Sequence, residues 1–160
     1  MEAVIFCGIQ GSGKTTFYKE RFFRTHLRIS LDLLHTRNKE ARFLQTCFTT
    51  YQRFVVDNTN PSIAERRRYI EAARTARFRV VCYFFETEVH EAIVRNSQRT
   101  GKELIPIAGI KGTFKKLQAP TYSEGFDLIY IVKIQTDRFI VMLLEKPKSQ
   151  ADELAKQSKE

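Results

Sequence analysis

The segment GIQGSGKT at residues 8–15 has the clearest chemistry, because it fits the pattern G-x-x-x-x-G-K-[ST] in full. Its glycines let the backbone curl so that successive N–H groups point into one concavity, where phosphate oxygens bind. The Lys14 ammonium can reach the β- and γ-phosphates of a nucleotide, and the Thr15 hydroxyl can coordinate Mg²⁺. A glycine-rich turn without a ligand is a weak alternative, since a predicted strand precedes the motif and a predicted helix follows it. We expect the nucleotide to be held by Gly8, Gln10, Gly11, Ser12, Gly13, Lys14, Thr15 and Thr16.

Two aspartates follow predicted strands and have different expected roles. Asp32 comes eighteen residues after Lys14, where a carboxylate can take the proton of a hydroxyl that attacks the γ-phosphate. Position alone favours a helix N-cap for Asp32. Asp57 ends the third predicted strand, where an acid typically binds Mg²⁺ or its water, although a turn or cap is the alternative. Thr15 and Asp57 are therefore the predicted metal ligands.

Arginines that follow the fourth predicted strand could cover the phosphates. Arg95 and Arg99 are four residues apart, so they share one face of a predicted helix, and Lys102 follows them. They could stabilise the charge on a transferred phosphoryl group, or simply solvate a helix end. The run Arg66–Arg68 is a weaker signal, from which Arg67 is the candidate for a substrate contact.

The composition indicates one basic domain. The 160 residues include 27 Lys and Arg against 18 Asp and Glu, a net charge of +9, and are 42% hydrophobic, which excludes wholesale disorder. Residues 1–80 hold fifteen of these basic residues and seven acidic ones, whereas residues 81–160 hold twelve and eleven. Such charge favours a polyanionic partner, although solvated helix faces are its more ordinary role.

Other features bear on location. No run approaches the roughly 18 apolar residues that a membrane span needs, so no membrane partner is expected. The start MEAVIFCG does not read as a signal peptide. Three separated cysteines, Cys7, Cys47 and Cys82, suit a reducing compartment, the cytoplasm or, in a eukaryote, the nucleus.

Short apolar runs alternate with amphipathic segments, which predicts an α/β domain over residues 1–145. Strands are expected at residues 3–7, 27–30, 53–57, 79–85 and 128–132, with a sixth at 139–144. Helices are expected at residues 14–23, 39–51, 60–76, 88–98 and 107–117, the third of them capped by Asn60. We predict a mainly parallel five-stranded sheet between helices, an extra C-terminal strand, and a polar, mobile tail at 146–160. Ligands of such sheets bind at the carboxyl ends of the strands.

Several segments together resemble the kinase domain of the polynucleotide 5′-kinase family, both the phage type and the kinase domain of the animal kinase-phosphatase. The resemblance covers roughly residues 3–133. The segments that carry it are DNTNP at 57–61 with the arginines and Tyr69 that follow, RNSQR at 95–99, IPI at 105–107 and APTYSEGFD at 119–127.

This resemblance implies a P-loop kinase fold and ATP-dependent phosphorylation of a 5′-hydroxyl on DNA or RNA, with Mg²⁺. It implies that Asp32 is the general base. It also implies that Arg99 contacts the donor phosphates, with Arg95 as a second arginine on the helix. Two positions depart from the family pattern: Ser30-Leu31 stands where Asn-Arg is usual, and His35 stands where the phage type has a clamping arginine. A histidine clamp would make acceptor binding sensitive to pH near neutrality.

On the acceptor side we expect contacts from His35, Arg37, Asp57, Thr59 and Arg67. The chain shows no D-x-D-G-T-like phosphatase motif, so a separate phosphatase or ligase is a candidate partner. Two alternatives stay open. One is a kinase of a small-molecule hydroxyl on a nucleoside, sugar or antibiotic, and the other is a non-catalytic, ATP-dependent module that binds nucleic-acid ends.

Overall fold

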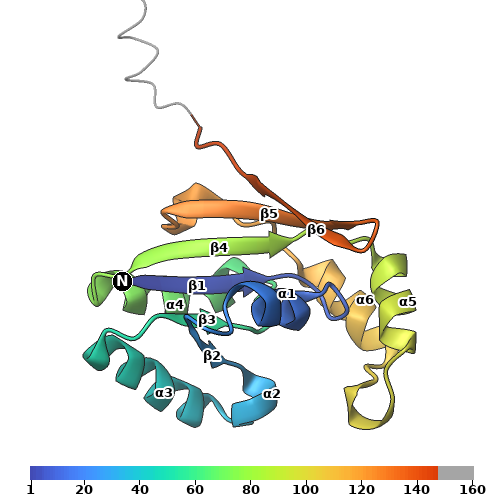
Figure 1. Ribbon diagram of the computed structural model, residues 1–160, viewed down its shortest axis with the longest axis horizontal. Coiled ribbons are helices and arrows are strands. Elements are labelled where there is room, and N and C mark those ends of the chain that lie inside the picture. The colour runs from blue at the N-terminus through green and yellow to red at the C-terminus, as the bar shows by residue number, and fades with distance from the viewer. Residues whose placement is uncertain (148–160) are drawn as a thin grey trace, which may run out of the picture.

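A six-stranded sheet is the frame of the protein, whose computed structural model describes residues 1–147 (Figure 1). The strand order is β2-β3-β1-β4-β5-β6. The strands are β1 (Glu2–Cys7), β2 (Leu27–Ile29), β3 (Phe54–Val56), β4 (Arg79–Phe85), β5 (Leu128–Gln135) and β6 (Arg138–Leu143). The first five pair in parallel, and β6 runs antiparallel to β5. The predicted parallel sheet with an extra C-terminal strand is confirmed.

The central strands are apolar because helices cover both of their faces. Alternate residues of β1 point to opposite sides, so Ile5 packs into one core cluster and Phe6 into the other. Both side chains are fully buried. The Phe6 cluster is rich in aromatic rings, among which Phe17 lies 6.0 Å from Phe6 between ring centroids. The sheet is thereby fixed as a rigid base for the loops at its carboxyl edge.

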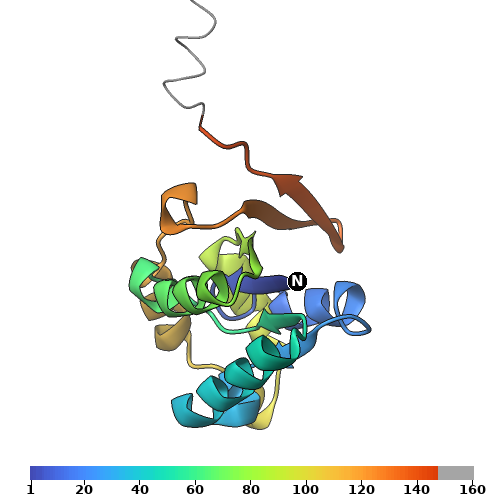
Figure 2. The same ribbon diagram turned by 90° about the vertical axis from the view of Figure 1, so that its left-hand side faces the viewer.

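Six α-helices and two 3-10 turns connect the strands. They are α1 (Lys14–Arg21), α2 (Leu31–Leu34), α3 (Arg37–Thr50), α4 (Ile63–Thr75), α5 (Val89–Ser97), α6 (Ile107–Lys116), η1 (Gly101–Glu103) and η2 (Tyr122–Glu124). Helices α3 and α4 pack on the Ile5 side of the sheet and α1 packs on the Phe6 side. Figure 2 shows α1 and α4 on opposite sides of the strands. The short helix α2 was not among the predicted elements.

The start of α4 differs from the prediction. Asn60 is not its N-cap, because Ser62 accepts from the Glu65 N–H and the Glu65 carboxylate accepts from the Ser62 N–H, a capping box. Asn60 instead has a left-handed backbone with φ 45° and donates from Nδ2 to the Phe6 carbonyl at 2.7 Å. This bond ties the loop after β3 to the end of β1.

The buried face of α4 also differs from expectation, because it includes an arginine. The helical spacing of the apolar residues predicts Ile63, Ile70 and Ala73 on this face. Ile70 and Ala73 are buried, but Ile63 is only half-buried. Arg66 is fully buried, and its Nε and Nη2 atoms donate to the two carboxylate oxygens of Glu124 at 2.8 and 2.9 Å. This ion pair joins α4 to η2. The charge of Arg66 therefore stabilises the fold and does not face a ligand.

The sequence also led to expectations about a membrane span and about the C-terminal tail. Within residues 1–147 no helix combines the length and apolar character needed to cross a bilayer. The tail predicted at 146–160 lies, from residue 148 onward, outside the described residues.

Candidate active site

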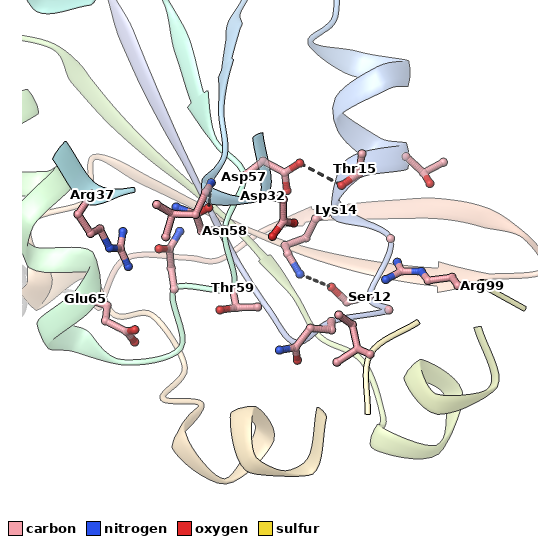
Figure 3. A pocket seen from close by; sticks show the side chains of 17 residues that line it. Ser12, Lys14, Thr15, Asp32, Arg37, Asp57, Asn58, Thr59, Glu65 and Arg99 are labelled. Carbon is pink, nitrogen blue, oxygen red and sulfur yellow. Dashed lines mark hydrogen bonds between the residues drawn. The ribbon is translucent and has the colours of Figure 1, made fainter. Parts of the chain in front are cut away.

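A cavity of about 300 Å³ opens at the carboxyl edge of the sheet (Figure 3). Its walls come from the loop after β1, from α2, from the loop after β3, and from the segment after α5. The lining residues are Gln10, Gly11, Ser12, Gly13, Lys14, Thr15, Thr16, Leu31, Asp32, Arg37, Asp57, Asn58, Thr59, Asn60, Glu65, Arg99 and Ile105.

The phosphate-binding loop has the conformation its glycines allow. Gly11 and Gly13 have φ of 76° and 90°, in the left-handed region that favours glycine. A Cβ on Gly11 would lie 2.5 Å from the carbonyl oxygen of Ala92, so α5 packs directly against the loop backbone. The glycine therefore serves both the turn and the close approach of α5.

Lys14 lies inside this loop and is held by it. Its ammonium donates to the carbonyls of Gly8 at 2.9 Å and Ile9 at 2.6 Å, and to Ser12 Oγ at 3.3 Å. The pKa of Lys14 is lowered from 10.5 to about 8, mainly because the group is buried. The Asp57 carboxylate opposes this shift, and the Arg99 guanidinium adds to it. An anion in the cavity would supply the counter-charge that this buried ammonium lacks.

Thr15 and Asp57, the predicted metal ligands, are in contact, and an arginine accompanies them. Thr15 Oγ1 donates to Asp57 Oδ2 at 3.0 Å. Arg28, on β2, donates from Nε to the same Asp57 oxygen at 2.7 Å and from Nη2 to Thr15 Oγ1 at 3.1 Å. Hydroxyl and carboxylate oxygens suit Mg²⁺, which proteins hold through few side chains together with substrate phosphates. The pair therefore fits such an ion, with Arg28 sharing the carboxylate.

Asp32 lies in the first turn of α2, whose position is set by a polar network. The Leu31 N–H donates to Asn58 Oδ1 at 2.9 Å, and Asn58 Nδ2 donates to Glu40 at 2.8 Å. Buried Glu40 also accepts from the Tyr69 hydroxyl at 2.9 Å. Asn58 thus links α2 to α3 and α4. This network positions α2, from which Asp32 lines the cavity near Lys14 (Figure 3).

Arg37 belongs to the same network. Its Nη1 donates to Glu40 at 2.8 Å and to the Tyr69 hydroxyl at 2.6 Å. Its side chain is still 44% exposed, so part of the guanidinium faces the cavity. Thr59 lines the cavity nearby, as Figure 3 shows.

The two arginines expected to cover the phosphates take different places. Helix α5 ends at Ser97, so the expectation that Arg95 and Arg99 share a helix face is wrong. Arg99 lines the cavity from the segment that follows the helix. Arg95 stays on α5, where it donates to the Gly11 carbonyl at 3.2 Å and pairs with Glu91 at 3.1 Å.

Other expected site residues lie outside the cavity lining. Gly8 contributes through its carbonyl to Lys14. His35 ends α2 with φ 65° and is exposed, and Arg67 is exposed on α4. Sequence reasoning gave no site role to Arg28, Asn58, Glu65 or Tyr69. Arg28, Asn58 and Tyr69 act through partners far along the chain, whereas Glu65 lines the cavity and bonds to the nearby Ser62. The one local signal was a charged residue, Arg28, between the apolar neighbours Leu27 and Ile29 in a strand.

Comparison with known proteins gives one family match and one curated relative. A family model described as an AAA domain, AAA_33, matches residues 30–120, a stretch that begins after the phosphate-binding loop. A bifunctional polynucleotide phosphatase/kinase of Schizosaccharomyces pombe is 28% identical over 131 residues, covering 78% of this chain and 32% of the relative. The chain therefore spans about a third of that relative's length.

Solved structures share the architecture at low identity. A gluconokinase from Sinorhizobium meliloti 1021 has a TM-score of 0.59 at 17% identity, with 82% of each chain covered. Chaetomium thermophilum Kti12 in complex with ADP-AlF3 has a TM-score of 0.61 at 17% identity, covering 82% of this chain and 88% of its own. A sugar kinase from Janibacter sp. HTCC2649 has a TM-score of 0.63 at 15% identity, covering 83% and 85%.

The phosphate-binding loop, the parallel sheet and the cavity at its carboxyl edge agree with these matches. The family model covers more than half of the chain. The chain belongs to the AAA_33 family of AAA domains, and its architecture is the α/β fold of P-loop kinases.

Proposed function

We propose that this protein is a polynucleotide 5′-hydroxyl kinase, which transfers the γ-phosphoryl group of ATP to the 5′-hydroxyl end of DNA or RNA. One observation carries the proposal: the Asp32 carboxylate faces the same cavity as Lys14 and Arg99. A protein that only binds nucleotide or nucleic-acid ends does not need a carboxylate there, whereas transfer to a hydroxyl needs a proton acceptor. The polynucleotide phosphatase/kinase name of the curated relative supports the choice of acceptor.

The chemistry divides between two sides of the cavity. On the donor side, the loop N–H groups, Lys14 and Arg99 would hold the phosphates and neutralise the charge that spreads over the γ-phosphoryl oxygens. On the acceptor side, Asp32 would accept the hydroxyl proton while the 5′-oxygen forms its bond to phosphorus. The bond from the γ-phosphorus to the bridging oxygen breaks, and the electron pair leaves with ADP. Mg²⁺, when bound by Thr15 and Asp57, supplies further neutralisation of phosphate charge.

The acceptor contacts follow from the same geometry. Arg37 and Thr59 line the cavity on the Asp32 side, so they are placed for the terminal nucleotide of the acceptor. Asp57 also lines the cavity, but its carboxylate is engaged by Thr15 and Arg28. His35 and Arg67 are exposed outside it, so we assign them to nucleotides further from the 5′ end. The side chain of Leu31 lines the cavity beside Asp32 and offers an apolar contact to a base or sugar.

The variant Asp32→Asn tests the proposal, because the amide keeps the shape of the carboxylate but cannot accept the proton. We expect transfer of labelled phosphate to a 5′-hydroxyl oligonucleotide to fall at least about 100-fold. The dissociation constant for ADP, measured by calorimetry, should stay within about twofold. Asp137→Asn, in the exposed turn before β6, is the matched control and should transfer normally.

Two results would contradict these assignments. Transfer at the wild-type rate by Asp32→Asn would show that Asp32 is not the base. Transfer by the wild-type protein to a sugar or nucleoside, but not to an oligonucleotide, would replace the proposed acceptor with a small molecule.

A further inference from the structure

Two helices of the Ile5 face end side by side at the amino edge of the sheet, opposite the cavity. After α3, the N–H groups of Tyr51 and Gln52 donate to the carbonyls of Phe48 at 3.4 Å and Cys47 at 2.9 Å. After α4, Arg77 and Phe78 repeat this pattern, donating to Arg74 and Ala73, both at 2.9 Å. Each helix therefore ends in a Schellman motif. The view of Figure 2 faces this edge.

The residues at the turning points of these motifs are unusual. This position has a left-handed backbone and is usually glycine, which adopts it without a clash of the Cβ atom. Here the positions are Tyr51, with φ 54°, and Arg77, with φ 60°. Both side chains are exposed, Tyr51 to 61%. Glycine would adopt this backbone conformation with less strain, so the conformation does not explain why tyrosine and arginine stand at these positions.

Aromatic and cationic groups gather around these two residues. The Tyr51 ring stacks on Phe78 with an interplanar angle of 2° and 6.3 Å between centroids. Beside it lies a hollow of about 480 Å³, lined by Arg74, Arg77, Phe78, Arg79 and Asp127. A second hollow of about 250 Å³, lined by Met1, Glu2, Arg53 and Arg79, adjoins it through the shared Arg79.

The positive charge of this edge is largely free. Asp127 accepts from the Val80 N–H at 2.7 Å and lies 3.8 Å from Arg74, whose Nη1 also donates to the Gly125 carbonyl. Glu2 pairs with His26 at 3.3 Å, and its pKa is lowered mainly by that contact and less by the charges of Arg79 and Arg53. Within the described part of the chain, no ion pair involves the side chains of Arg53, Arg77 or Arg79.

We propose that this amino edge is a second nucleic-acid site, separate from the cavity, which binds a single-stranded segment. A base would stack on Tyr51, whose rear face is fixed by Phe78, and the flanking phosphates would contact Arg77, Arg79 and Arg53. Stacking platforms beside arginines bind single strands of any sequence in this way. Binding at this site does not require phosphoryl transfer, so it can be tested independently of the proposed kinase activity.

Fluorescence anisotropy with a labelled single-stranded 20-nucleotide probe tests the site. The probe carries a 5′-phosphate, so it offers no hydroxyl for transfer. The variants are Tyr51→Gly and Arg77→Gly, which keep the backbone conformation and relieve its strain. We expect Tyr51→Gly to weaken binding about fivefold or more. Arg77→Gly should also weaken it and reduce the slope of log affinity against log salt by about 0.7.

Controls separate this result from unfolding and from general loss of charge. The midpoint of urea unfolding of both glycine variants should equal or exceed that of the wild type. Weaker binding by these variants would then not result from unfolding. Lys116→Gln removes one exposed charge at the end of α6 and should bind the probe like the wild type. Asp137→Asn, in the exposed turn before β6, should also bind normally.

Unchanged affinity in both folded glycine variants would overturn the proposal. So would equal loss in Lys116→Gln, which would show that only net charge matters. Competition by polyglutamate as effective as competition by unlabelled oligonucleotide would also overturn it, in favour of an acidic protein partner.

Discussion

At the scale of single residues, Arg28 gives the site a feature that the sequence motifs do not contain. Its guanidinium joins the Thr15 hydroxyl and the Asp57 carboxylate, and it also lies 5.9 Å from the centroid of the Tyr18 ring. The Asp57 side chain is only 2% exposed, so its charge needs this partner in the free protein. A divalent ion bound by Thr15 and Asp57, as proposed, would have to share the carboxylate with this guanidinium or displace it.

We predict that Arg28→Gln lowers the free energy of unfolding by about 2 kcal/mol, because a buried carboxylate loses its main counter-charge. Urea unfolding measures this change. The affinity for ADP should rise more on addition of Mg²⁺ in the variant than in the wild type, since the metal no longer competes with a guanidinium. Arg68→Gln, an exposed position on α4, is the control. An equal effect of Mg²⁺ in both proteins would show that Arg28 does not compete.

The lowered pKa of Lys14 leads us to predict that nucleotide affinity depends on pH. In the free protein burial lowers its pKa to about 8, whereas nucleotide phosphates favour the charged form and raise that pKa again. Above about pH 8 binding must therefore take up a proton, and the affinity for ADP should fall by up to tenfold per pH unit. Folding stability changes in the opposite direction, because the unfolded chain keeps this proton up to a pKa near 10.5. The contribution of Lys14 to the free energy of unfolding therefore rises between about pH 8 and about pH 10.5.

Calorimetry in buffers of different ionisation enthalpy measures both the affinity and the proton uptake. Lys14→Arg stays charged throughout this range and should show no proton uptake at this position. A flat affinity between pH 7.5 and about pH 9.5 for the wild type, with no proton uptake, would contradict the assignment.

At the scale of elements, the phosphate-binding loop depends on the approach of α5. Gly11→Ala would place a Cβ against the backbone of Ala92, and both the loop and α5 would have to move. Gly101→Ala is a matched control, because Gly101 has φ +60° but a Cβ added there would have no neighbouring atom within 4 Å. We expect Gly101→Ala to cost about 1 kcal/mol through backbone strain alone and to leave ADP binding intact.

Gly11→Ala should cost at least about 1 kcal/mol more and abolish ADP binding. Urea unfolding and calorimetry give the two quantities. Equal stability and equal ADP affinity of the two alanine variants would show that the contact between α5 and the loop is unimportant.

The elements also show how far sequence reasoning reaches. The strand β4 was predicted at its observed bounds, because a parallel strand buried on both faces is a continuous apolar run. The start of α4 was misplaced, because Asn60-Pro61 and Ser62 with Glu65 are both helix-start signals and only tertiary contact with Phe6 decides between them. The burial of Arg66 could not be predicted, because its partner Glu124 lies 58 residues away.

At the scale of the site, sequence reasoning singled out residues that line the cavity but not those that position them. Lys14, Asp32 and Arg99 follow local patterns, and the structure brings all three to one cavity. Asn58 and Tyr69 act through hydrogen bonds between α2, α3 and α4. Such contacts join segments far apart in sequence, so the motif that contains Asn58 and the position of Tyr69 do not reveal their partners.

At the scale of the whole molecule, the sheet separates the two edges to which we assign functions. The carboxyl edge holds the cavity, and the amino edge holds the cluster of Tyr51 with arginines. Helices α3 and α4 extend from one edge to the other, since Arg37 and Ile63 begin them near the cavity and Thr50 and Thr75 end them at the amino edge. Under the two proposals made above, the basic excess of the N-terminal half would be divided between donor phosphates and nucleic-acid contacts.

The most direct test of the proposed function is the identity of the phosphorylated product. Wild-type protein would be incubated with γ-labelled ATP, Mg²⁺ and equal concentrations of a 5′-hydroxyl oligonucleotide, the same oligonucleotide with a 5′-phosphate, a nucleoside and gluconate. We predict that label enters the 5′-hydroxyl oligonucleotide alone, at its 5′ end. Label in the nucleoside or gluconate, with none in the 5′-hydroxyl oligonucleotide, would contradict the proposal that this protein is a polynucleotide 5′-kinase.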